Sequence, residues 1–370
     1  MELALYDQQD GYYMTLRSQE PDGGEAQSER IGWSGDYYTA PDVHPLLAKA
    51  IFNQVCEADD LLNHPSGLTI LEMGGGKGIL ARDILRESER VAPEFRSRLL
   101  YLLVECSPSM RASQKRHLEE FIQRGWSIRW ASSLSELGAQ EVIGVIFSNE
   151  LVDALPVHRV TMQEGSLKEV FVNCEGKKFS EGLGKVSTNE LSTYLQDNHV
   201  DLPDGYTTEV HLEAVRWMEE VARVLNQGIV ITIDYGHTAR DYYGSSRSKG
   251  TLLCYYRHTV SEDPYVHVGE QDITAHVNFS GLALAGQRKG LSVTGFSNLM
   301  NFLLSLGAEE VLAGLDQESK QLQSAIHLLR PNGMGETFKV LIQHKGMEAP
   351  SLRGLQFRPF FEGALLGNEP

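Results

Sequence analysis

Apolar runs alternate with amphipathic stretches over most of the 370-residue chain. Runs that are apolar nearly throughout, as in strands buried on both faces of a parallel sheet, occur at Leu68–Leu71, Arg98–Glu105, Ser127–Trp130, Val142–Phe147 and Gly228–Asp234. Apolar residues at helical spacing occupy Leu46–Leu62, Ile79–Val91 and Glu209–Leu225. Strands that alternate with helices in this way predict an α/β fold with a doubly wound, Rossmann-like sheet.

Two long connections interrupt this alternation. Between Val157 and Val186, alternating residues and glycine turns predict β-hairpins, and the long segment Tyr235–Asn278 is a second candidate for a substrate surface. We therefore divide the chain into a core of residues 46–156 and 205–345, a hairpin insertion at 157–204 and a substrate-side loop at 237–278. Residues 1–45 are expected to be a loop-rich segment that includes a cover for the site, with Pro21–Glu25 as a mobile stretch, and 346–370 a tail.

Charge and composition limit the kinds of partner and site that the protein can have. The chain has 50 acidic and 33 basic residues, a net charge of -17, which disfavours nucleic acid and anionic lipid as partners. Its 4 cysteines are scattered and its histidines are irregularly spaced, so no metal site is predicted. No apolar stretch reaches the ~20 residues of a membrane helix, and the first residues lack the pattern of a signal peptide. We expect a soluble, cytoplasmic protein that does not bind membranes.

The glycine turn after the first predicted strand is the leading candidate for a cofactor site. Glu72, Gly74, Gly76 and Gly78 form an acid followed by alternate glycines, and Glu105 ends the next strand, where it can accept bonds from both hydroxyls of a ribose. This frame resembles the first motif of class I S-adenosylmethionine-dependent methyltransferases. A dinucleotide fingerprint beginning at Gly76 is the alternative, but it gives no role to Glu72.

Polar residues also follow the fourth predicted strand. Asn149, Glu150 and Asp153 leave the strand at the edge that faces the ligand. Two carboxylates there can hold a planar guanidinium and orient one of its nitrogens toward a methyl donor. In the alternative interpretation Glu150 caps the following helix and Asp153 is solvated. Elsewhere, Asp272 is expected to cap a helix.

Segments spread over nearly the whole chain are similar to those of one known family. They are, in order, Gly35–Pro41, Leu71–Gly78, Asn149–Pro156, Asp234–Gly236, Asp272–Val277 and Met334–Val340. Through these segments the chain resembles the MidA-like methyltransferases, whose mitochondrial members assist assembly of respiratory complex I. The resemblance implies a class I methyltransferase core with insertions, S-adenosyl-L-methionine as cofactor, and a protein arginine as methyl acceptor, such as one in a complex I subunit.

Residue by residue, the resemblance adds Thr39, Ser133, Leu134 and Asn149 to the cofactor site. It assigns the catalytic role to Glu150, assisted by Asp153. Two other functions stay open: a complex I assembly factor that binds S-adenosylmethionine without methyl transfer, and a small-molecule methyltransferase. The lack of a transit peptide favours a bacterial, cytoplasmic protein, with the mitochondrial matrix as the alternative if the beginning of the chain is missing.

Overall fold

The computed structural model describes residues 1–15, 30–32, 35–176, 178–357 and 365–366. Its centre is an 8-stranded sheet in the order β14-β15-β9-β4-β1-β2-β3, with the short β13 paired to β9. The strands are β1 Leu68–Met73, β2 Leu99–Val104, β3 Ser127–Ala131, β4 Val142–Asn149, β9 Leu225–His237, β13 Val277–Asn278, β14 Ser292–Asn298 and β15 Phe338–Lys345. Only β15 runs against its neighbours, pairing antiparallel with both β9 and β14. The predicted doubly wound sheet is confirmed.

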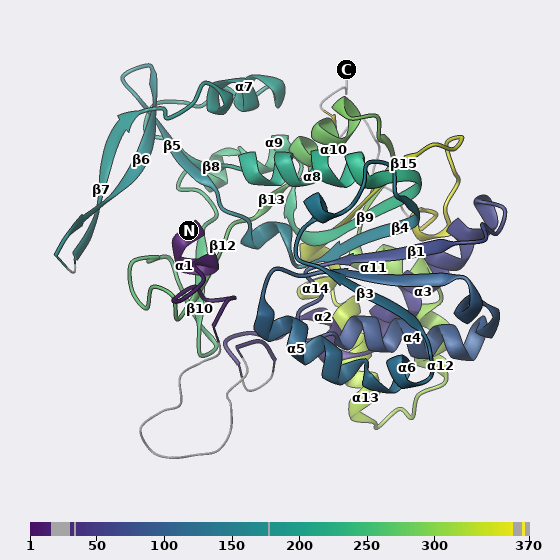
Figure 1. Cartoon of the computed structure of the whole chain (residues 1–370). Helices are drawn as coiled ribbons and strands as arrows, with labels where there is room; N and C mark the ends of the chain where they lie inside the picture. The colour runs from purple at the N-terminus through teal and green to yellow at the C-terminus, as the bar shows by residue number, and fades with distance from the viewer. Residues whose placement is uncertain (16–29, 33–34, 177, 358–364, 367–370) are drawn as a thin grey trace, which may run out of the picture.

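Helices cover both faces of this sheet, as Figure 1 shows. Along β1, Ile70 packs with the helices of one face and Leu71 with those of the other, because successive side chains of a strand point to opposite sides. One face carries α3 Leu46–Leu61, α4 Ile79–Val91, α11 Leu299–Ser305 and α13 Lys320–Leu329. The other carries α8 Leu212–Val224 and α10 Phe279–Arg288.

The remaining helices are short and complete the connections. They are α2 Ala40–Val43, α5 Pro108–His117, α6 Glu119–Gln123, α7 Glu190–Asp197, α9 Ala239–Tyr242, α12 Ala308–Ala313 and α14 Met334–Thr337, with 3-10 turns η1 Pro93–Ser97, η2 Leu134–Glu136, η3 Val152–Ala154, η4 Ser245–Arg247 and η5 Arg353–Leu355. Within the described residues, no helix combines the length and apolar character needed to cross a membrane.

The predicted hairpin insertion is present. Strands β5 His158–Gln163, β6 Ser166–Glu175, β7 Lys178–Lys185 and β8 Thr207–Val210 form a 4-stranded sheet in the order β7-β6-β5-β8. In Figure 1 its long hairpin projects at the upper left, away from the central sheet. The helix predicted from Glu209 begins later, at Leu212, because Glu209 belongs to β8 and pairs with Arg159 of β5.

The substrate-side loop and the beginning of the chain hold more regular structure than predicted. Residues 237–278 contain a 3-stranded sheet of β10 Leu253–Tyr256, β11 Thr259–Ser261 and β12 Asp272–Thr274. The prediction that Asp272 caps a helix is wrong, since it begins β12 and pairs with Tyr255.

The first residues are also ordered differently from the prediction. They form a helix, α1 Glu2–Tyr6, which packs on β10 and β12 through Leu5, Tyr12, Cys254 and Ile273. The predicted flexible stretch Pro21–Glu25 lies outside the described residues.

Candidate active site

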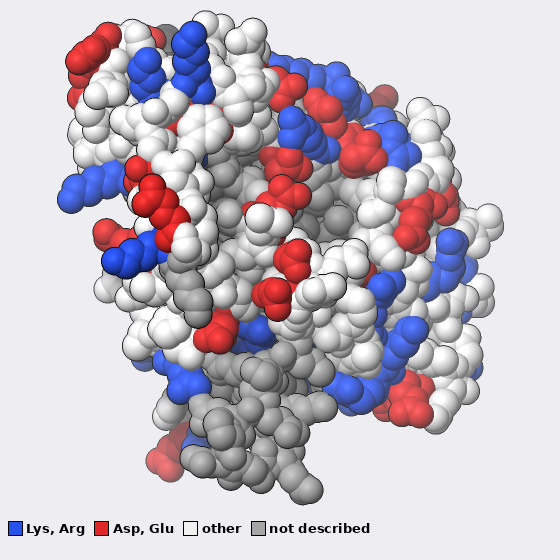
Figure 2. All heavy atoms as spheres, turned by 60° about the vertical axis from the view of Figure 1, so that its left-hand side comes forward, with Lys and Arg blue, Asp and Glu red and all other residues white. Residues whose placement is uncertain are grey.

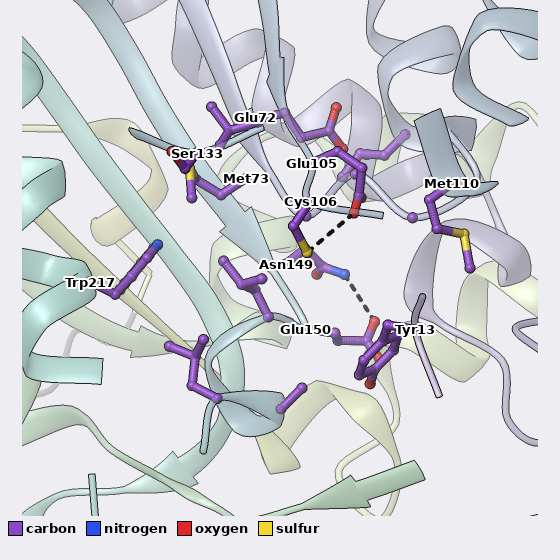
Figure 3. A pocket seen from close by; sticks show the side chains of 18 of the residues that line it. Tyr13, Glu72, Met73, Glu105, Cys106, Met110, Ser133, Asn149, Glu150 and Trp217 are labelled. Atoms are coloured by element: carbon purple, nitrogen blue, oxygen red, sulfur yellow. Dashed lines mark hydrogen bonds between the residues drawn. The ribbon is translucent and has the colours of Figure 1, made fainter. Parts of the chain in front are cut away.

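A cavity of about 500 Å³ lies where β1, β2 and β4 end, within the size range of small-molecule sites. Its wall comes from the glycine turn after β1, the loops after β2, β3 and β4, helix α8, and two segments from the beginning of the chain. Figure 3 shows side chains from these elements around one space, with Glu105, Cys106 and Asn149 near its middle.

The glycine turn lies against this cavity. Gly74 and Gly76 have φ values of 64° and 49°, in the left-handed region that favours glycine. A Cβ atom at Gly76 would meet nothing within 4 Å, so the missing side chain leaves open space on the cavity side. These two glycines are placed as predicted for a turn that approaches a ligand closely.

Gly78 has a different role from the one predicted. It does not line the cavity but stands at the N-cap of α4 with φ 88°. A Cβ atom there would lie 2.9 Å from the Cα atom of Gln114. Gly78 therefore allows α4 to pack closely on α5, and the structure gives no support to a direct cofactor contact.

The two strand-end acids lie side by side. The Tyr101 hydroxyl donates to Glu72 Oε2 at 2.7 Å. Burial raises the pKa of Glu72 to about 7, against the lowering effect of this hydrogen bond. Burial also raises the pKa of Glu105, whose two oxygens accept bonds from the Ser107 N–H at 2.9 Å and the Gln114 amide at 3.2 Å.

Thr39, Ser133, Leu134 and Asn149, the residues that the resemblance added to the cofactor site, all line the cavity. Thr39 is the N-cap of α2, where its hydroxyl donates to Asp42 Oδ2 at 2.9 Å. Ser133 and Leu134 come from the loop after β3, and Asn149 from the end of β4. Three separate segments of the chain thus meet at one space.

Glu150 also lines the cavity, and its backbone is strained. Its φ of 53° lies in the left-handed region, which is uncommon for a residue with a side chain and occurs often at functional sites. Its Oε1 accepts hydrogen bonds from the Ala40 N–H at 3.0 Å and from the Asn149 amide at 2.9 Å. Burial raises the pKa of Glu150 to about 8, with nearby Asp153 adding to the rise.

Asp153 is buried and does not line the cavity. Its Oδ2 accepts a hydrogen bond from the Tyr235 hydroxyl, while its Oδ1 has no hydrogen-bond partner in the part of the chain described. Asp153 therefore lies behind Glu150 as seen from the cavity, and its position does not support direct contact with an acceptor.

The capping alternative for these acids does not hold. The backbone N–H groups of residues 151–153 all donate to Asp234 Oδ2, at 3.2, 2.9 and 3.3 Å. Asp234 is thus the residue that fixes this loop. Glu150 accepts bonds from other segments, and Asp153 is not solvated.

Several residues of the cavity were not predicted. Tyr6, Tyr13, Tyr37 and Trp217 all line it, from α1, the segment after α1, the segment before α2, and α8. Trp217 lies in the predicted helix and Tyr37 in Gly35–Pro41, one of the segments that carry the family resemblance, but neither was assigned to the site. Tyr6 and Tyr13 have no local signal. Only the folded chain brings them together.

Charge around this side of the molecule is mainly acidic. Figure 2 shows a hollow with Asp and Glu side chains gathered beside it. The exposed acids Glu213 and Glu220 of α8 line the cavity, together with Arg216, which pairs with Glu213 and Glu190. A cationic ligand would be favoured at this surface.

Comparisons with known proteins decide the family. Residues 47–297 match the model of a family described as "Putative S-adenosyl-L-methionine-dependent methyltransferase". The chain belongs to this family. A crystal structure from Burkholderia thailandensis, bound to S-adenosyl-homocysteine, is similar at 30% identity and a TM-score of 0.84, over 97% of this chain and 89% of that chain. The cofactor of this methyltransferase is accordingly S-adenosyl-L-methionine, and the dinucleotide alternative is wrong.

Curated relatives are more distant. The chain is 24% identical to the mitochondrial protein arginine methyltransferase NDUFAF7 homolog of Drosophila melanogaster, over 95% of this chain and 82% of the relative. It is 25% identical to the mitochondrial protein arginine methyltransferase NDUFAF7 of Danio rerio, over 86% of this chain and 78% of the relative.

The residues of the cavity fit S-adenosyl-L-methionine. The open side of Gly76 leaves room for its amino-acid part. Glu105 Oε2 accepts one hydrogen bond from the protein, from Gln114, and keeps a lone pair that a ribose hydroxyl can reach, while Oε1 accepts from the Ser107 N–H and the Cys106 thiol. Ser133 and Leu134, after β3, would then border the adenine, and Glu150 lies toward the other end of the cavity in Figure 3.

Proposed function

We propose that this methyltransferase transfers a methyl group to an arginine side chain of a partner protein. The observation that carries the proposal is the position of Glu150, a carboxylate in the wall of the cofactor cavity with a strained backbone. Among the described residues, no lysine or arginine forms an ion pair with it. The names of the curated relatives, protein arginine methyltransferases, support the same acceptor.

Glu150 has the properties that an arginine acceptor needs. A carboxylate accepts two parallel N–H bonds from a guanidinium, which fixes the plane of the group and aims one nitrogen. The Ala40 N–H and the Asn149 amide hold Glu150 Oε1 in place, so the carboxylate is positioned before an acceptor arrives. Asp153, behind it, would add negative charge without contact.

The chemistry is a displacement. Bound S-adenosyl-L-methionine supplies a methyl group on a positively charged sulfur. The guanidinium nitrogen held by Glu150 forms the new N–C bond as the S–C bond breaks, and that nitrogen loses one proton. Burial raises the pKa of Glu150 to about 8, so the side chain is largely protonated at neutral pH in the ligand-free protein. A bound guanidinium favours the ionised form of the carboxyl group, which can then take this proton.

A substitution at Glu150 tests the proposal. Glu150→Gln keeps the shape of the side chain but removes its charge, and Glu213→Gln removes a charge from an exposed acid of the same cavity. We expect Glu150→Gln to lower single-turnover methyl transfer by about 100-fold or more with S-adenosyl-homocysteine affinity kept, and Glu213→Gln to change it little. Transfer by Glu150→Gln at the native rate would contradict the role of Glu150.

The identity of the partner is a further part of the proposal. A complex I subunit is the first candidate acceptor, because of the family resemblance. Incubation of that subunit with isotope-labelled donor, followed by mass spectrometry, separates three outcomes: label on an arginine supports the proposal, label on free metabolites indicates a small-molecule enzyme, and tight binding without label indicates an assembly factor. The cytoplasmic location, with the mitochondrial matrix as the alternative, stays a prediction.

A further inference from the structure

Three tyrosines from the beginning of the chain form one wall of the cavity. Tyr6, Tyr13 and Tyr37, here called the tyrosine wall, are each half-buried and each line the space. The rings of Tyr6 and Tyr13 stack with centroids 5.6 Å apart, and the hydroxyls of Tyr13 and Tyr37 are 3.4 Å apart. In Figure 3, Tyr13 and Glu150 appear at the same end of the cavity, with Ser133 and Trp217 at the other side.

The hydroxyls of this wall are held by the protein. Tyr13 donates to Asp272 Oδ1 at 2.7 Å, and Tyr6 donates to the carbonyl oxygen of Ala154 at 3.1 Å. A tyrosine hydroxyl has one proton to donate, so neither residue can offer that proton to a ligand. What remains available to the cavity is the aromatic ring.

Two buried carboxyl groups lie behind the rings. Asp272 and Asp153 are both buried, and Asp153 lies near enough to act on Asp272. Burial, with the charge of Asp153, raises the pKa of Asp272 to about 7. Within the described ranges, no lysine or arginine pairs with either carboxylate. Acids buried without a cation are costly, and a cation brought by a ligand would relieve that cost.

We propose that the tyrosine wall, backed by Asp272, is the acceptor subsite and selects a planar cation over a neutral group. A guanidinium is flat and weakly hydrated and binds well against aromatic faces, whereas a compact ammonium keeps its water more strongly. The subsite would place the guanidinium between the rings and Glu150. This inference rests on the proposed function and assigns its specificity to residues that are not part of the cofactor site.

The test uses three adenosine compounds, each with an alkyl chain attached through a nitrogen on the 5′ carbon. The chain ends in a guanidine in the first compound, a urea in the second and an amine in the third. The urea has the same planar shape as the guanidine without the charge. Calorimetry gives the affinity of the whole chain for each compound and for S-adenosyl-homocysteine. We expect the native protein to bind the guanidine about tenfold or more tightly than the urea, and more tightly than the amine.

Variants assign this preference to the wall. Tyr13→Phe keeps the ring and should keep most of the preference, while Tyr13→Leu removes the ring and should reduce it by about threefold or more. S-adenosyl-homocysteine affinity should stay unchanged in both, which also shows that they fold. If Tyr13→Leu does not fold, Tyr37→Leu gives the same measurement from a neighbouring ring.

The outcomes separate the two proposals. Equal binding of guanidine and urea by the native protein would contradict the arginine acceptor, and with it the subsite. Two other results would overturn the tyrosine wall as the element that selects the guanidine. In one, the native protein prefers the guanidine and Tyr13→Leu or Tyr37→Leu keeps that preference; in the other, the variants bind guanidine and urea more weakly by the same factor. Neither result would contradict the arginine acceptor.

Discussion

The Ser107 hydroxyl donates a 2.6 Å hydrogen bond to the backbone carbonyl of Tyr13. The backbone N–H of the same serine bonds Glu105 Oε1 at 2.9 Å. Ser107 therefore joins the acid proposed to hold the cofactor ribose to the wall proposed to hold the acceptor.

Ser107→Ala should weaken binding of the acceptor and leave binding of the cofactor nearly unchanged. The variant keeps the N–H that Glu105 accepts but loses the bond to Tyr13 and the N-cap bond to Met110, with a cost of about 1 to 2 kcal/mol in stability. We expect a higher KM for the acceptor and little change in calorimetric affinity for S-adenosyl-homocysteine. Ser107→Thr, which keeps the hydroxyl, is the control; a loss confined to cofactor affinity would contradict the link.

Glu105→Ala should weaken the cofactor rather than the acceptor. Removing charge-assisted hydrogen bonds to the ribose should raise the dissociation constant of S-adenosyl-homocysteine by about 10-fold to 100-fold. Calorimetry measures this directly, with Glu213→Gln as a variant in the same cavity that should behave as the native protein. Unchanged affinity would show that Glu105 does not contact the sugar.

Substitution by alanine should have different effects at Gly76 and at Gly78. Gly78→Ala places a Cβ atom against the backbone of Gln114 at a φ of 88°, so we expect a loss of about 1 to 3 kcal/mol in stability. Gly76→Ala meets no protein atom within 4 Å, so its φ of 49° alone should cost about 1 kcal/mol in stability, and the added methyl group should also lower S-adenosyl-homocysteine affinity. Thermal unfolding and calorimetry on both variants measure this difference. A melting temperature of Gly78→Ala equal to that of the native protein would contradict it.

Stability of the ligand-free protein should fall as pH rises toward 8. Glu150, Glu72 and Asp272 have pKa values raised by burial to about 8, 7 and 7, whereas in the unfolded chain they ionise near 4.5 for Glu and 3.8 for Asp. Between these values the three acids bind more protons in the folded state than in the unfolded state, which lowers the free energy of unfolding as pH rises. Below pH ~3 these groups are mostly protonated in both states and contribute little slope. Burial lowers the pKa values of His211, His237 and His276 to about 3, 3 and 4, and these groups act in the opposite direction up to their unfolded pKa of 6.5, so the net decline is expected from pH 7 to pH 8.

Unfolding by urea at a series of pH values measures this slope. Glu150→Gln removes one of the groups and should give a shallower decline than the native protein. Glu213→Gln, which changes an exposed acid, should leave the slope as it is. A native protein whose stability rises from pH 7 to pH 8 would contradict the burial of uncompensated acids in this cavity.

The sequence was informative where the signal is local. Glu72, Gly74 and Gly76 follow one strand within a few residues, and Glu105 ends the next, so strand periodicity alone brings them to one edge of the sheet. The tyrosine wall could not be predicted in this way. Tyr13 and Asp272 are 259 residues apart, and their hydrogen bond depends on α1 packing against β10 and β12.

Tertiary neighbours also decide where three of the predicted residues lie. Asp272 has the residue type of a helix cap, but pairing with β10 makes it the start of a strand. Gly78 fits the motif by spacing, yet its need for glycine comes from α5, a neighbour that the motif does not contain. Asp153 follows Glu150 closely in sequence but turns to Tyr235, because Asp234 fixes the loop between them.

The central claim is that the methyl group goes to an arginine of a protein. Incubation of the enzyme with methyl-labelled S-adenosyl-L-methionine and the candidate complex I subunit, followed by complete hydrolysis and amino-acid analysis, tests it most directly. The account predicts label in methylated arginine with native enzyme and a loss of about 100-fold with Glu150→Gln. Label in any other amino acid, or equal labelling by the two enzymes, would contradict it.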